Sequence, residues 1–188
     1  MQTRVRKMIV NAGFRLDGFS GCLTIARHQR QPETIPRHSA MNILNLAARP
    51  ITLTDADTSR PIALTLDQIR QQLAHYPPSD YAWETAIQTV EDALYPLRDL
   101  RQNTQPLAVQ GAAPLLALPH QAHPRGAIIT RDTLEHAFAV AAGYRPQSSL
   151  PPLPQTTDFC AVLLLLREWA HHLDYETLIL LNESQKAA

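Results

Sequence analysis

Residues 157–173, TDFCAVLLLLREWAHHL, contain the longest apolar run in the chain. All residues from 159 to 166 are apolar, so a helix with about 3.6 residues per turn would be apolar on every side over its first two turns. Thr157, two residues before this run, is a typical N-cap residue. The run is much shorter than the roughly 20 residues needed to span a bilayer. It therefore predicts a helix that is surrounded by protein rather than by lipid.

Three more helices are predicted from cap residues and apolar spacing. The first covers residues 66–75, where Thr65 and Gln68 match the capping-box pattern. The third follows Thr130 and ends before Gly143, a typical residue just past a helix end. The second, residues 80–97, carries apolar side chains spaced alternately by four and three, which predicts a narrow helix-packing seam: Trp83, Ile87, Val90, Leu94 and Leu97.

Short apolar segments between these helices predict strands. A hairpin is expected over residues 51–64, with a long loop because residues 55–61 are rich in turn-forming side chains. Residues 115–118 are expected to be a strand or a buried extended loop, and residues 127–130 are interpreted as the entry into a helix. Residues 107–109 are likewise expected to be a short strand or a buried extended loop, and further strands are expected at residues 42–47 and 177–181. The fold class predicted is α+β and helix-dominated, with about four helices packed on a small, mostly antiparallel sheet.

Charge is distributed unevenly along a chain whose formal net charge is zero. Residues 1–40 contain seven basic and two acidic side chains, a net charge of +5, and the remainder contains ten basic and fifteen acidic ones. We expect residues 1–40 to be a basic extension, poorly ordered or not native, with translation beginning at Met41. A nucleic-acid-binding arm and a transit peptide are the alternatives. Residues 41–188 are expected to form a single α+β domain.

Composition excludes several classes of protein. Apolar residues make up 45% of the chain and charged residues 18%, as expected for a protein with a packed core. Only two cysteines are present, Cys22 and Cys160, too few for a disulfide framework, so a cytoplasmic location is expected. Arginine greatly outnumbers lysine, which suggests a bacterial origin. The acidic body has no basic helix, so nucleic-acid binding is not expected outside residues 1–40.

The densest group of polar side chains lies at the end of the last helix. Glu168 precedes His171 by three residues and His172 by four, so all three fall on one helix face. Glu-x-x-His is half of the metal site found in helical di-metal proteins. The other half would come from the helix after Thr130, which carries Asp132, Glu135 and His136. The alternative is that these charges only complement the two helix dipoles.

Other candidate motifs are weaker. His120 and His123 have a spacing that zinc sites use, but they lie in a proline-rich segment where solvent-exposed histidines are common. Asp55 and Asp57 resemble the start of a calcium loop, but the glycine and the final glutamate are missing. No phosphate-binding glycine motif and no nucleophile motif occurs, and no cofactor is predicted.

These observations predict a non-catalytic accessory or protein-interaction module. The seam of residues 83–97 and the apolar run of residues 159–166 supply more apolar surface than a small sheet can cover. We therefore expect a protein partner, or self-association as a homodimer, through these helix faces. The alternative is a metal-dependent hydrolase that uses the helical Glu/His cluster. A further alternative is a regulator that binds a small ligand.

Overall fold

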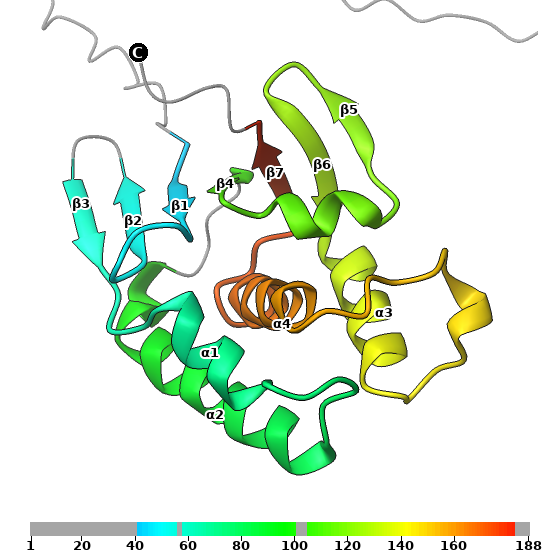
Figure 1. Cartoon of the computed structure of the whole chain (residues 1–188). Coiled ribbons are helices and arrows are strands. Elements are labelled where there is room, and N and C mark those ends of the chain that lie inside the picture. The colour runs from blue at the N-terminus through cyan, green and yellow to red at the C-terminus, as the bar shows by residue number, and fades with distance from the viewer. Residues whose placement is uncertain (1–40, 56–57, 101–104, 183–188) are drawn as a thin grey trace, which may run out of the picture. The chain divides into compact units, whose positions relative to one another are not determined.

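The computed structural model describes residues 41–55, 58–100 and 105–182. These residues form one seven-stranded sheet in the order β3-β2-β1-β4-β7-β6-β5 (Figure 1). The strands are β1 (Ile43–Asn45), β2 (Thr52–Asp55), β3 (Thr58–Pro61), β4 (Leu107–Gln110), β5 (Gln121–His123), β6 (Gly126–Thr130) and β7 (Thr177–Leu181).

The middle of the sheet is parallel, so the predicted small, mostly antiparallel and helix-dominated architecture is wrong. Strand β4 pairs in parallel with β1 on one side and with β7 on the other. Antiparallel strands flank this centre, with β2 and β3 beyond β1 and with β6 and β5 beyond β7. The sheet is thus mixed, and it extends across the whole described domain.

The sheet was predicted wrongly because its strands are short and the strands that pair are far apart in the sequence. β4 and β7 are buried along most of their length, as central parallel strands are, so they show no alternation of polar and apolar residues. Their pairing joins segments about 70 residues apart, which no local pattern reveals. Residues 127–130, interpreted as a helix entry, belong to strand β6, and residues 113–117 form a short 3-10 helix.

Four α-helices lie in the described residues: α1 (Leu66–Gln72), α2 (Asp80–Leu94), α3 (Arg131–Ala141) and α4 (Thr157–His172). The capping box of Thr65 and Gln68 is present at α1, and Thr130 caps α3, as predicted. The N-cap of α4 is Thr156, one residue earlier than expected. Helix α2 ends at Leu94, and the chain continues as the 3-10 helix η1 (Tyr95–Leu100).

Helix α4 is the centre of the core. In Figure 1 it lies beneath the sheet, with α1 and α2 on one side and α3 on the other. Residues 159–166 are fully buried, which confirms that protein surrounds this part of the helix. The seam of α2 is buried too, except for the half-buried Ile87, and the Trp83 ring meets Phe138 of α3 edge-on at 5.2 Å between centroids.

The burial of these helix faces removes the reason for expecting them to bind a partner. Trp83, Val90 and Leu94 are at most 2% exposed within the single chain. The apolar surface that a small sheet would have left open is covered by a larger sheet and by the other helices. Self-association therefore remains a prediction without a surface assigned to it.

Three other expectations have different outcomes. The hairpin of β2 and β3 exists, but its loop is shorter than predicted, because strand pairing extends as far as Asp55 and Thr58. The extension of residues 1–40 lies outside the described residues. Among the described residues, no helix combines the length and apolar character needed to cross a membrane.

Cys160, in the second turn of α4, is fully buried and unpaired. Desolvation by burial raises the pKa of this thiol to about 11. Because the folded-state pKa lies above that of an unfolded thiol, the protonated form contributes stability below pH ~8.5 that is lost as the pH rises toward 11.

We therefore expect Cys160 to resist thiol reagents in the folded protein at pH 8. In a Cys22→Ser variant, Ellman's reagent should release less than one thiol equivalent before unfolding and one equivalent in denaturant. Rapid labelling of the folded variant would contradict the burial of this helix.

Candidate functional site

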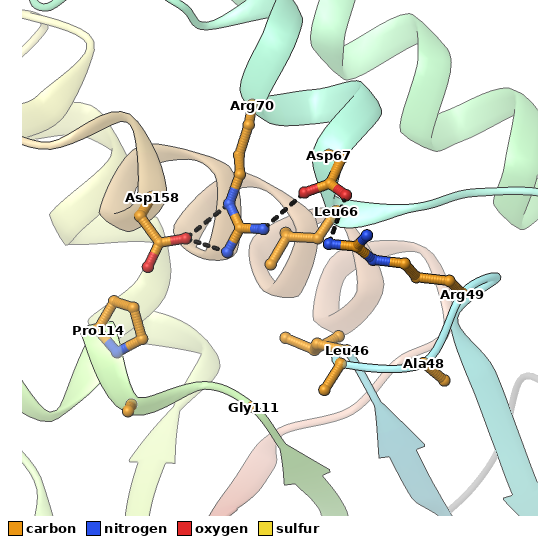
Figure 2. Close-up of a pocket in the computed structure, with 11 residues that line it drawn as sticks. Leu46, Ala48, Arg49, Leu66, Asp67, Arg70, Gly111, Pro114 and Asp158 are labelled. Carbon is orange, nitrogen blue, oxygen red and sulfur yellow. Dashed lines mark hydrogen bonds and ion pairs between the residues drawn. The ribbon is translucent and has the colours of Figure 1, made fainter.

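One candidate pocket lies at the carboxyl ends of the parallel strands β1 and β4 (Figure 2). After β1 the chain turns toward β2, and after β4 it leaves in the opposite direction, toward the β5–β6 side of the sheet. In open α/β sheets, ligands bind at such points of divergence. The pocket has a volume of about 470 Å³, and its walls come from the β1–β2 turn, the segment after β4, helix α1 and the start of α4.

Gly111 forms the floor of this pocket directly after β4. Its φ of +80° is in the left-handed region, and a Cβ here would lie 3.2 Å from the backbone nitrogen of Ala47. The two loops can approach each other because this residue has no side chain.

The charged side chains of this pocket pair with one another. Arg49 lies 2.8 Å from Asp67, and Arg70 donates hydrogen bonds to Asp67 at 2.9 Å and from Nε to Asp158 at 2.7 Å. Burial alone would lower the pKa of Arg70, but the hydrogen bonds to Asp158 and Asp67 outweigh it and raise that pKa. Figure 2 shows the four side chains as a continuous row.

Two arginines and two aspartates balance, so this row joins the β1–β2 turn, α1 and α4 without leaving a net charge. The pocket has the position of a ligand site. Its charged groups, however, are already engaged with each other, and none is poised for chemistry.

A second cluster, formed by Glu91, Glu168 and His172, lies between helices α2 and α4. One donor atom from each side chain lies within 4.8 Å of the other two. Nε2 of His172 is 3.2 Å from Oε1 of Glu91 and 3.3 Å from Oε2 of Glu168. Glu168 is only 1% exposed, whereas Glu91 and His172 are half-buried. The cluster therefore reaches from the protein interior to the surface.

The hydrogen bonds of this cluster leave one buried oxygen unsatisfied. Oε1 of Glu168 accepts a hydrogen bond from Arg167, but Oε2 has no hydrogen-bond partner. Nε2 of His172 carries at most one proton, and its hydrogen-bond contact is with Glu91. A buried carboxylate oxygen without a donor costs roughly 1–3 kcal/mol or more. A cation bound to all three donor atoms would satisfy this oxygen.

The donor spacing fits a divalent metal. Ligand atoms at about 2.0–2.1 Å from a tetrahedral ion lie about 3.4 Å apart, close to the separations of Nε2 of His172 from the two glutamate oxygens. Two carboxylates and one imidazole suit Zn²⁺, Mn²⁺ or Fe²⁺. Three protein ligands also leave at least one coordination position open, as in catalytic rather than structural sites.

The cluster borders a second pocket, with a volume of about 390 Å³. Glu91 and His172 line it, so a metal held by them would be reached from solvent. Its remaining walls come from the end of α2, from η1 and from Leu173. A metal site and a space for a small molecule are thus adjacent in this part of the fold.

The structure separates the six predicted metal ligands. Glu168 and His172 are brought together, but Glu135 of α3 contacts Arg167 at 2.8 Å and His171 at 3.4 Å instead. Arg167 joins the two groups because it donates hydrogen bonds to both Glu135 and Glu168. Burial disfavours its charge, but these hydrogen bonds raise its pKa, so Arg167 stays a cation between the two carboxylates.

The remaining candidates lie elsewhere. Asp132 is exposed in the first turn of α3, where its charge complements the helix N-terminus, and His136 is half-buried on the same helix. His120 contacts the carbonyl of Leu118 through Nδ1 at 2.8 Å. His123 lies in β5 and accepts a hydrogen bond from the backbone of Arg125. These two histidines therefore use ring nitrogens in local backbone contacts.

Glu91 was missed because the ligands that would complete the site were sought on the helix after Thr130 and not on α2. It follows Ile87 by four residues and precedes Leu94 by three, so it borders the apolar seam of that helix. A carboxylate beside a packing seam meets the neighbouring helix at its edge. That position was the available signal.

Comparisons with known proteins inform the fold alone. No protein-family model matches the chain, and no curated protein matches it either. Solved structures of an Aquifex aeolicus PPX-GPPA enzyme and of the Ppx/GppA phosphatase from that organism each superpose with a TM-score of 0.56. The identities are 9% and 11%, over 76% and 77% of this chain. The match spans 53% of each solved chain, so this protein corresponds to about half their length.

Proposed function

We propose that this protein is a metal-dependent hydrolase, with a divalent ion held by Glu91, Glu168 and His172. The single observation that carries the proposal is Oε2 of Glu168. It is buried, has no hydrogen-bond donor, and lies 3.3 Å from a second potential ligand, His172. This arrangement is costly without a cation and favourable with one.

Each protein group has a distinct role in this proposal. Glu168 supplies a ligand that Arg167 fixes through its other oxygen. Glu91 and His172 complete the set and face the adjoining pocket, where a substrate has room to approach. A divalent ion held by these residues would supply Lewis acidity and would lower the pKa of a water molecule toward 7.

Phosphate esters are the substrates that we propose to test. The structural neighbours are described as Ppx/GppA phosphatases, which supports a hydrolase more than a non-catalytic module. The identity is low and only half of each solved chain is matched, so their own substrates are not transferred. A general phosphomonoester, p-nitrophenyl phosphate, is therefore the appropriate first substrate.

The test compares two neighbouring histidines in protein treated with EDTA and then reloaded with Mn²⁺ or Zn²⁺. We expect hydrolysis of p-nitrophenyl phosphate only after metal is restored. His172→Ala should lose at least about 100-fold, more than removing a residue that merely supports a ligand. His171→Ala, next to it but paired with Glu135, should stay close to the wild type.

Two results would contradict the proposal. One is hydrolysis that persists after metal removal, and the other is an equal loss in both histidine variants. Circular dichroism melting curves for each variant verify that the comparison is made between folded proteins.

A further inference from the structure

Arg98 has an unusual position beside the metal cluster. It lies in η1, lines the same pocket as Glu91 and His172, and is exposed. Its guanidinium stacks over the ring of Tyr95, with Cζ 4.3 Å from the ring centroid. Stacking of this kind holds the planar group in place and leaves its N–H edges free to donate.

The charge of Arg98 is not neutralised by the described residues. The arginines 49, 70, 131 and 167 form ion pairs with carboxylates, whereas Arg98 makes none within the described ranges. Asp92 lines the same pocket and keeps its negative charge, but it makes no ion pair with Arg98, and its carboxylate accepts a hydrogen bond from Gln88 at 2.8 Å. A guanidinium that is exposed, held by stacking and without an ion pair to a described residue is suited to binding an anion in the pocket.

From this juxtaposition we propose that Arg98 is the specificity-determining residue of the pocket, and that it binds the anionic phosphoryl group at the reacting end of the substrate, beside the metal. The inference rests on the proposed function, because the metal defines where the reacting end lies. It goes beyond that function by naming the side chain that recognises the negative charge of the phosphoryl group. Neutral esters are then poor substrates.

The experiment uses the full-length protein loaded with Mn²⁺, and phenylphosphonate as a non-hydrolysable probe, measured by isothermal titration calorimetry. Arg98→Ala should weaken phenylphosphonate binding by about tenfold or more, because a charge-assisted hydrogen bond is lost. Arg98→Lys should bind phenylphosphonate with intermediate affinity, since lysine keeps the positive charge but lacks the planar guanidinium. Metal affinity should be unchanged in both variants.

Arg145→Ala is the matched control, because Arg145 is exposed and does not line this pocket. If the wild type binds no Mn²⁺, the proposed function and this inference both fail. If it binds Mn²⁺ and phenylphosphonate but Arg98→Ala binds the phosphonate as tightly, this inference alone is overturned. An equal weakening in Arg145→Ala would also overturn it, because the effect would then be one of net charge.

Discussion

Gly126→Ala should destabilise the domain by at least about 3 kcal/mol, among the largest effects expected of one added methyl group. Gly126 opens β6 with a φ of +150°, and a Cβ at this position would lie 1.9 Å from the carbonyl oxygen of Leu180. That oxygen belongs to the backbone of β7, the strand that joins the parallel centre to the β5–β6 hairpin. The backbone of Leu180 cannot move away without breaking the pairing of β6 with β7.

Gly143→Ala provides the matched control. Its φ is +79°, but a Cβ added here would meet nothing within 4 Å, so only the left-handed backbone is penalised, by about 1 kcal/mol. Urea unfolding monitored by circular dichroism measures the free energy of unfolding of both glycine variants. Equal losses in the two variants would contradict the close packing of β6 against β7.

The second large effect is expected at Phe159, in the first turn of α4. Its side chain is fully buried at the start of the helix around which the domain is packed. Phe159→Ala should cost about 3–5 kcal/mol, from lost burial and from the cavity that remains. The melting temperature should fall accordingly, as measured by differential scanning calorimetry.

Tyr81→Ala is the comparison for Phe159→Ala, since Tyr81 is 77% exposed on α2. Removing this exposed ring should change stability by less than about 0.5 kcal/mol. A small effect at Phe159, similar to that at Tyr81, would show that α4 is not the centre of the core.

Helices were predictable because their signals are local. Thr65 with Gln68, and Thr130 alone, mark helix starts through hydrogen bonds to residues three positions away. The burial of residues 159–166 likewise follows from a run that is apolar on all sides of a helix. Such features need no knowledge of the rest of the chain.

The sheet was not predictable in the same way. Ala108 pairs with Ile43 on one side and with Ile179 on the other, across separations that periodicity cannot reveal. The strands have three to five residues, too few to distinguish alternation from a helix entry, as residues 127–130 illustrate.

Two of the predicted ligands belong to the cluster, because Glu168 and His172 lie on one helix face at a spacing of four. The third member of the cluster comes from another helix, so it can be identified only from the way α2 packs against α4. The prediction named Asp132, Glu135 and His136 of α3, and the structure pairs Glu135 with Arg167 instead. A side chain at the edge of a packing seam, as Glu91 is, is the kind of residue to consider in such a search.

Zinc titration calorimetry on the wild type, Glu91→Gln and Glu84→Gln tests the metal site most directly. Glu91 is half-buried and Glu84 is exposed on the same helix, so both changes remove one charge from α2. We expect one ion per chain in the wild type and in Glu84→Gln, with affinity reduced at least about tenfold in Glu91→Gln. Absence of stoichiometric binding to the wild type, or equal affinity in all three proteins, would contradict a metal held by Glu91, Glu168 and His172.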